Sequence, residues 1–146
     1  MGDVRLHGIN LVTGNMEAAL AFYRELGVEI PESNVWSTES GMHHVTAADP
    51  TEVDVEFDSV ELAGSYNDSS KVQDPTGSTL VGFSVGTREE VDAIYERLVG
   101  LGHRSLHPPT DAFWGARHAI IEDPDGRPIG IMSPSDPERQ SPPPDI

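Results

Sequence analysis

The sequence contains no cysteine, which excludes disulfide bonds, thiolate metal sites and a thiol nucleophile. Basic residues are also few, with 9 Lys and Arg against 25 Asp and Glu and a formal net charge of -16. A chain this acidic repels phosphate backbones and anionic lipids, so neither nucleic acid nor a membrane is expected as a partner. No segment approaches the roughly 20 apolar residues that span a bilayer, and the N-terminus lacks a basic stretch followed by an apolar run. We therefore expect a cytoplasmic protein.

A chain of 146 residues is long enough to bury one hydrophobic core, so we expect a single domain over residues 1–132. The acidity has two interpretations. It can simply provide a well-hydrated surface, or it can attract a cationic ligand.

The first half predicts a strand, a helix and three further strands. Residues 4–13 alternate and are rich in branched side chains, which is typical of a strand. Asn15 is a suitable N-cap for a helix over 16–26, where apolar residues recur at helical spacing until Gly27. Further strands are expected at 35–38, 43–48 and 53–57.

The second half repeats this order. A strand at 79–85 precedes a helix whose start is marked by Thr87 and Glu90, the spacing of a capping box. Strands follow at 116–122 and 128–132, and Pro108-Pro109 is expected to form a turn between the helix and these strands. We therefore expect an α+β fold of two βαβββ modules, about 1–59 and 78–132. Residues 60–77 are expected to be a polar linker, and the proline-rich residues 133–146 a disordered tail.

Three motifs carry a resemblance to a known family. They are FYREL at 22–26, DAFWGAR at 111–117 and the DPDG turn at 123–126. With them the chain resembles the vicinal oxygen chelate superfamily, which includes glyoxalase I, extradiol dioxygenases, fosfomycin resistance enzymes and bleomycin resistance proteins. The resemblance implies curved mixed sheets around a cleft, helices outside, and frequent pairing into a homodimer.

The resemblance also locates the family's metal ligands, which lie on the first and last strands of each module. Carried over by position, they fall on Gly8, Glu56, Leu80 and Gly130. One ligand out of four does not make a metal site, because a divalent ion needs about three protein ligands. We expect no metal and no cofactor, with a divalent metal as the alternative.

Three histidines could alter this conclusion. If Gly8 faces the cleft, strand alternation turns His7 toward the helix layer. His43 and His44 are adjacent, so only one of them can face inward. We expect none of the three to be a ligand.

Strand alternation gives a set of cleft residues. Asp54, Glu56 and Asp58 alternate with apolar residues and should share the cleft face, or else be ordinary solvated acids. His118 should face the cleft from the second module. Trp114 and Phe113, in the loop before it, can stack on a ligand or plug the core. The expected ligand-binding residues are Asn10, Asp54, Glu56, Phe113, Trp114 and His118.

Two hypotheses for function follow. The first is a metal-independent protein of the bleomycin-resistance type that sequesters a small cationic or aromatic molecule, such as an antibiotic. The second is a lyase, isomerase or dioxygenase-like enzyme that uses Glu56 or His118 as its catalytic residue, with or without a divalent metal. The sequence does not decide whether the protein is an enzyme.

Overall fold

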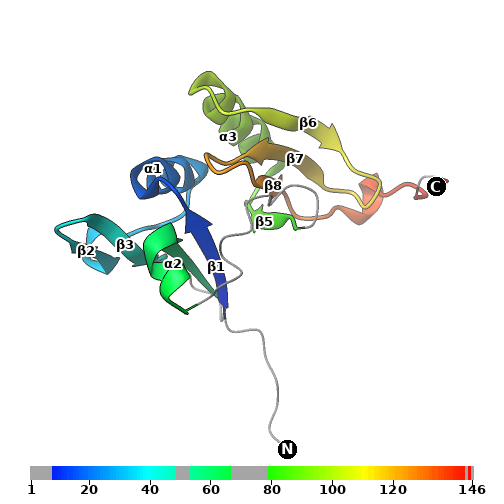
Figure 1. The fold of residues 1–146 in the computed structure, drawn as a ribbon. Helices are drawn as coiled ribbons and strands as arrows, with labels where there is room; N and C mark the ends of the chain where they lie inside the picture. The colour runs from blue at the N-terminus through cyan, green and yellow to red at the C-terminus, as the bar shows by residue number, and fades with distance from the viewer. Residues whose placement is uncertain (1–7, 49–52, 67–78, 144, 146) are drawn as a thin grey trace, which may run out of the picture. The chain divides into compact units, whose positions relative to one another are not determined.

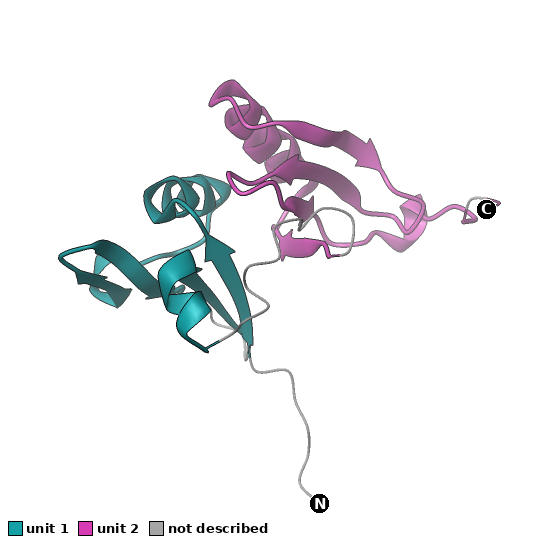
Figure 2. Ribbon diagram, in the orientation of Figure 1, with its two compact units in different colours: residues 1–74 teal, residues 75–146 magenta. Residues whose placement is uncertain are grey.

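The computed structural model describes residues 8–48, 53–66, 79–143 and 145. The chain divides into two compact units, residues 1–74 and 75–146, which we describe separately (Figure 2). His7 lies outside the described residues. No helix in the described part of the chain is long and apolar enough to cross a membrane.

Unit 1 is a four-stranded mixed sheet with two helices (Figure 1). Its elements are β1 (Gly8–Thr13), α1 (Met16–Leu26), β2 (Val35–Thr38), β3 (Gly41–Thr46), β4 (Asp54–Ser59) and α2 (Val60–Tyr66). The strand order is β1-β4-β3-β2, with β1 parallel to β4 and the other pairs antiparallel.

The core of unit 1 lies between α1 and one face of the sheet. Asn15 caps the start of α1 by accepting a hydrogen bond from the Ala18 amide, and Gly27 ends it at a φ of 115°. The helix buries Phe22 and Tyr23, and the Tyr23 ring lies 4.8 Å from that of Phe57 on β4. Because this face takes the apolar residues of each strand, the alternate residues point to the opposite face.

Unit 2 repeats the arrangement. Its elements are β5 (Val81–Ser84), α3 (Arg88–Gly100), β6 (Ser105–Asp111), β7 (Arg117–Glu122) and β8 (Pro128–Met132). The strand order is β5-β8-β7-β6, again with the first pair parallel. Thr87 and Glu90 form the predicted capping box of α3. Fully buried residues on the helix and on β7 and β8 form the core: Val91, Leu98, Ala119, Ile121, Ile129 and Ile131.

The α+β class and the two repeated modules are therefore confirmed, but three segments differ from the expectation. Residues 60–66 of the expected linker form α2. Residues 105–111, where a proline turn was expected, form β6, which tolerates Pro108 and Pro109 because it is an edge strand with register shifts.

The third difference concerns the expected disordered tail. Ser133 donates its amide hydrogen to the Arg117 carbonyl, and Ser141 donates to the Phe113 carbonyl at 2.9 Å. A short 3₁₀ turn at Pro137–Arg139 lies between these contacts. Backbone pairing with a structured loop holds this segment despite its proline content.

Candidate functional site

A polar face lies on unit 1, on the side of the sheet opposite α1. The register places Asn10 on β1 beside Glu56 on β4, and His44 on β3 beside Asp58 on β4. Thr46 is the β3 partner of Glu56. With Tyr66 from α2, these residues form what we call the polar face: Asn10, His44, Thr46, Glu56, Asp58 and Tyr66.

Asp58 is the centre of the polar face. Its side chain is only 2% exposed. It accepts hydrogen bonds from Nδ2 of Asn10 at 2.9 Å, from Nδ1 of His44 at 2.6 Å and from the Tyr66 hydroxyl. Burial alone would raise the pKa of Asp58, but these three hydrogen bonds and the charge of a protonated His44 outweigh it and hold the pKa below its usual value. Asp58 is therefore a buried anion that fixes the residues around it.

The same hydrogen bond acts on Tyr66. Donation to the Asp58 carboxylate, together with burial and the nearby negative charges, raises the pKa of the Tyr66 phenol. The phenol therefore stays protonated and keeps donating to Asp58.

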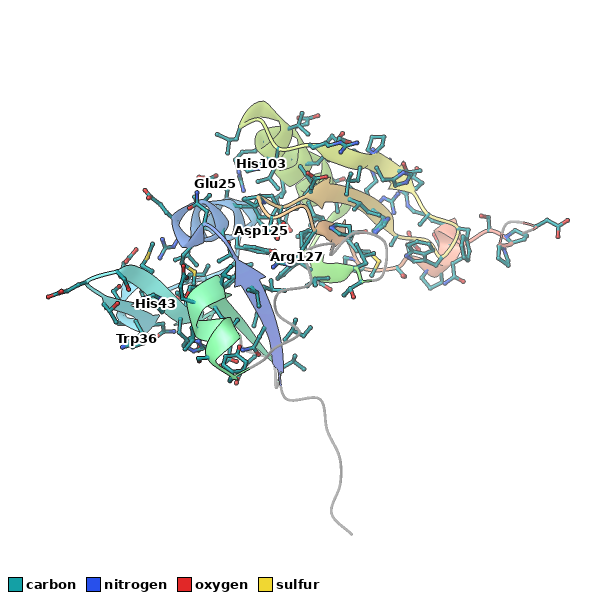
Figure 3. The ribbon with its side chains drawn as sticks, in the orientation of Figure 1. Glu25, Trp36, His43, His103, Asp125 and Arg127 are labelled. Atoms are coloured by element: carbon teal, nitrogen blue, oxygen red, sulfur yellow. The ribbon has the colours of Figure 1, made fainter. Side chains whose placement is uncertain are left out.

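His44 presents its second ring nitrogen to Thr46 and Glu56. Nε2 lies 3.2 Å from Oγ1 of Thr46 and 3.9 Å from Oε1 of Glu56. His43, by contrast, turns away and is buried, with Nδ1 bonded to the Ser59 hydroxyl at 2.8 Å. Figure 3 shows His43 beside Trp36, whose ring centroid is 5.5 Å away. His44, and not His43, thus belongs to the polar face.

Unit 2 carries an apolar counterpart on the side of its sheet opposite α3. Gly82 on β5 and Gly130 on β8 are register partners and leave the sheet bare between Leu80 and His118. A Cβ built on Gly82 would meet nothing within 4 Å, and one built on Gly130 would lie 3.5 Å from Nε2 of His118 and 3.7 Å from Cδ1 of Leu80. The two glycines, which we call the floor, put no side chain on this part of the sheet, and His118 and Leu80 reach to the edge of Gly130.

Aromatic rings stand beside this floor. The Trp114 ring lies 5.7 Å from that of His118 and 5.1 Å from that of Phe113, and the His107 ring lies 6.2 Å from that of His118. The Trp114 indole N–H points at Sδ of Met132, 3.3 Å away. We call the following set the aromatic face: Leu80, Gly82, His107, Phe113, Trp114, His118, Gly130 and Met132.

The surroundings of His118 favour its neutral form. Burial lowers the pKa of His118 below its usual value, and the neighbouring His107 lowers it further. Next to an indole, a neutral imidazole suits a flat apolar group better than an imidazolium would.

The loop that carries Trp114 is held in place on both sides. Nη1 of Arg88 donates to the Gly115 carbonyl at 3.1 Å, and the Asp136 amide donates to the same oxygen at 3.1 Å. Gly115 has a φ of +94°, and a Cβ there would lie 2.3 Å from the Asp136 carbonyl oxygen. The C-terminal segment therefore packs directly against the loop that presents Trp114.

The expected site residues thus fall into two groups. Asn10 and Glu56 join the polar face, and Asp54 lies two residues before Glu56 on β4, beside Gly8. Phe113, Trp114 and His118 join the aromatic face. The sequence missed His44 and Tyr66. Strand alternation showed that one of the adjacent histidines had to face inward, but nothing indicated Tyr66, which lies in the expected linker.

The residues at the family's metal positions do not fit a metal centre. Gly8 and Gly130 have no side-chain donor, and Leu80 is apolar. Within the described part of the chain, no group of three or more His, Asp or Glu side chains is arranged to hold a metal ion. Glu56 alone keeps a possible ligand atom.

The comparisons with known proteins agree on the family. The family model described as Glyoxalase/Bleomycin resistance protein/Dioxygenase superfamily matches residues 5–131. A search of curated proteins found no match.

Three solved structures illustrate the likeness. One is a glyoxalase/bleomycin resistance protein/dioxygenase from Nocardioides, 23% identical, covering 94% of this chain and 87% of that one, with a TM-score of 0.67. A family enzyme from Burkholderia phytofirmans PsJN is 19% identical, with coverage of 89% and 98% and a TM-score of 0.73. A superfamily member from Sphaerobacter thermophilus DSM 20745 is 25% identical, with coverage of 90% and 98% and a TM-score of 0.63. The chain belongs to the glyoxalase/bleomycin resistance protein/dioxygenase superfamily.

Proposed function

We propose that this chain is a metal-independent binding protein for a small molecule with a flat aromatic group, and that the aromatic face of unit 2 holds this group. The observation that carries the proposal is the bare floor of Gly82 and Gly130 with Trp114 and His118 beside it. A flat ring placed on the glycines contacts backbone below and aromatic edges at its side, an arrangement that favours stacking. Sequestration of an antibiotic would need no more than this complementarity.

Independence from metal is supported by the residues at the family's ligand positions, three of which have no ligand atom. A catalytic role for Glu56 or His118, with or without a divalent metal, is the alternative function. Pairing into a homodimer and a cytoplasmic location stay predictions from the sequence.

The test uses proflavine, a planar aromatic cation, and the fluorescence of Trp114. The chain has 2 tryptophans, so Trp36→Phe leaves Trp114 as the only tryptophan reporter. We expect saturable quenching in the metal-free W36F protein, and no change in affinity when Zn²⁺, Ni²⁺, Mn²⁺ or Fe²⁺ is added.

A leucine at position 82 provides the decisive variant. A Cβ at Gly82 meets nothing within 4 Å, so Gly82→Leu directs its side chain over the floor from an open position. Binding should fall at least about tenfold, since the flat contact is blocked. Gly100→Leu, at the end of α3, is the matched control because a Cβ there also meets open space. Equal affinity in G82L and G100L, or stoichiometric metal in the purified protein, would overturn the proposal.

A further inference from the structure

His118 brings a ring nitrogen to the bare part of the sheet in unit 2. A Cβ built on Gly130 would lie 3.5 Å from Nε2 of His118 and 3.7 Å from Cα of Gly82, so this nitrogen stands at the edge of the floor. The imidazole is half-buried, and it contacts the rings of Trp114 and His107. Among the residues that the structure describes, none forms a hydrogen bond with either ring nitrogen of His118. Nε2 is therefore available to a ligand that lies on the floor.

The surroundings of His118 decide which polar group of a ligand suits this nitrogen. Burial and the neighbouring His107 lower the pKa of His118, which disfavours the imidazolium that a carboxylate or phosphate would pair with. The formal net charge of -16 also repels an anion. A neutral imidazole has one N–H donor and one acceptor nitrogen, and an ammonium group, which only donates, fits one of the two tautomers. A hydroxyl group both donates and accepts, so it can pair with Nε2 in either tautomer.

We propose that the flat aromatic group held by unit 2 carries a hydroxyl on its ring, and that His118 selects this hydroxyl by a hydrogen bond through Nε2. The C–O bond of a phenol lies in the plane of its ring, so a ring over Gly82 carries its hydroxyl along the sheet toward Gly130. It meets Nε2 there, since this nitrogen and the Gly82 Cα lie within 3.7 Å of the same point. Leu80, whose Cδ1 is also 3.7 Å from that point, adds an apolar contact at the same edge.

This inference rests on the function proposed above and deepens it, because it names the class of ligand for the same site. It adds one polar contact to the stacking of a flat ring on the aromatic face. The contact requires no metal and no second oxygen on the ligand, since one hydroxyl and one imidazole form it. His118 is then the residue that distinguishes a hydroxylated ring from an unsubstituted one.

The test compares 2-naphthol with 2-methylnaphthalene, which differ by a hydroxyl in place of a methyl group. Both are uncharged at about pH 7, since a phenol such as that of tyrosine has a pKa of about 10. Displacement of proflavine from the full-length protein, followed by proflavine fluorescence, gives the two affinities. We call the Kd of 2-methylnaphthalene divided by that of 2-naphthol the preference. A second readout is the ¹⁵N chemical shift of the His118 ring, for which we expect a saturable change at Nε2 that is larger with 2-naphthol.

Two variants separate the hydrogen bond from the stacking. His118→Phe keeps a flat ring and removes both nitrogens, so the preference should fall about fivefold or more, which corresponds to the loss of one hydrogen bond. 2-Methylnaphthalene should still bind to H118F. His103→Phe makes the same exchange between α3 and β6, outside the aromatic face, and should keep the preference of the wild type.

The outcomes distinguish this inference from the function on which it rests. An equal preference in H118F and H103F would overturn the inference. So would the absence of a saturable Nε2 shift with 2-naphthol in the wild type, a measurement that needs no variant and therefore holds even if H118F does not fold. In both cases, binding of proflavine would still support the function proposed above. Failure of the wild type to bind proflavine would overturn both.

Discussion

Replacing Asp58 by asparagine tests the network that holds the polar face together. The side chain is 2% exposed and accepts three hydrogen bonds, from Asn10, His44 and Tyr66. An asparagine has one side-chain acceptor oxygen with two lone pairs, and Asn10 and Tyr66 donate to the same oxygen of Asp58, so at least one donor, that of His44 in this orientation, loses its partner. A hydrogen bond to a charged group contributes about 1.5–3 kcal/mol, which is the loss expected for one such bond. Asn10 and Tyr66 keep a neutral acceptor, so the expected cost of D58N is about 2 kcal/mol.

Urea unfolding, followed by circular dichroism, measures this change. Tyr66→Phe is the matched control, because it removes one donor and leaves the carboxylate intact; its cost should be about 1 kcal/mol. A loss below about 1 kcal/mol in D58N would refute the assignment of Asp58 as the centre of the network.

The pH dependence gives a second check on the same variant. The folded pKa of Asp58 lies below its unfolded value, so its charge adds stability above the unfolded pKa of about 3.9, and this stability is lost as the pH falls through the folded pKa. The side-chain amide that replaces the carboxylate in D58N does not titrate. The difference in unfolding free energy between wild type and D58N should therefore shrink when the pH is lowered below about 4. A difference that stays constant to the lowest accessible pH would contradict an ionised Asp58.

Two further predictions concern unit 2. Gly115→Ala should cost about 2 kcal/mol or more and release the C-terminal segment, since its Cβ would lie 2.3 Å from the Asp136 carbonyl oxygen at a φ of +94°. Gly126→Ala is the control, because Gly126 has a φ of +87° but open space around it, so the variant carries only the backbone strain. Equal losses of unfolding free energy in G115A and G126A would refute the packing contact. Unchanged amide exchange at Ser141 in G115A would refute it as well. His118→Asn should flatten the dependence of stability on pH: the folded pKa of His118 is lowered, so the wild type loses stability as the pH falls below about 6.5 toward the folded pKa. Identical urea midpoint shifts between about pH 7.5 and pH 5 in wild type and H118N would contradict this.

The helices show what local sequence can and cannot specify. α1 was predicted with its observed bounds because Asn15 and Gly27 mark both ends and an apolar stripe runs between them. α2 has seven residues, buries only Ala63 and has no such stripe. Its amide at Leu62 bonds to the Ser59 hydroxyl, and Tyr66 bonds to Asp58. Tertiary contacts of this kind are not visible in a short polar window of sequence.

The strands show a similar division. Alternation placed Glu56 and Asp58 on one face, as the structure has them, because a strand's period is fixed by its geometry. It could not say whether His43 or His44 joins them, since that depends on the register of β3 against β4. The hydrogen-bonded pairing of His44 with Asp58 is set between strands 14 residues apart in sequence. β6 was missed because two adjacent prolines normally indicate a turn. They are tolerated in a strand at the edge of a sheet with register shifts, and the sequence shows neither feature.

The repeat also explains why one chain has two faces of opposite chemistry. The parallel pair in unit 1 places Asn10 beside Glu56, and the parallel pair in unit 2 places Gly82 beside Gly130. These are corresponding positions of the two modules, since Glu56 and Gly130 each lie seven residues past the first Asp of an Asp-Pro pair. One module therefore has hydrogen-bonding side chains at these positions, while the other has two glycines. A duplicated scaffold keeps its apolar core residues on the helix side, so the opposite face can differ in chemistry between the two modules while the architecture stays the same.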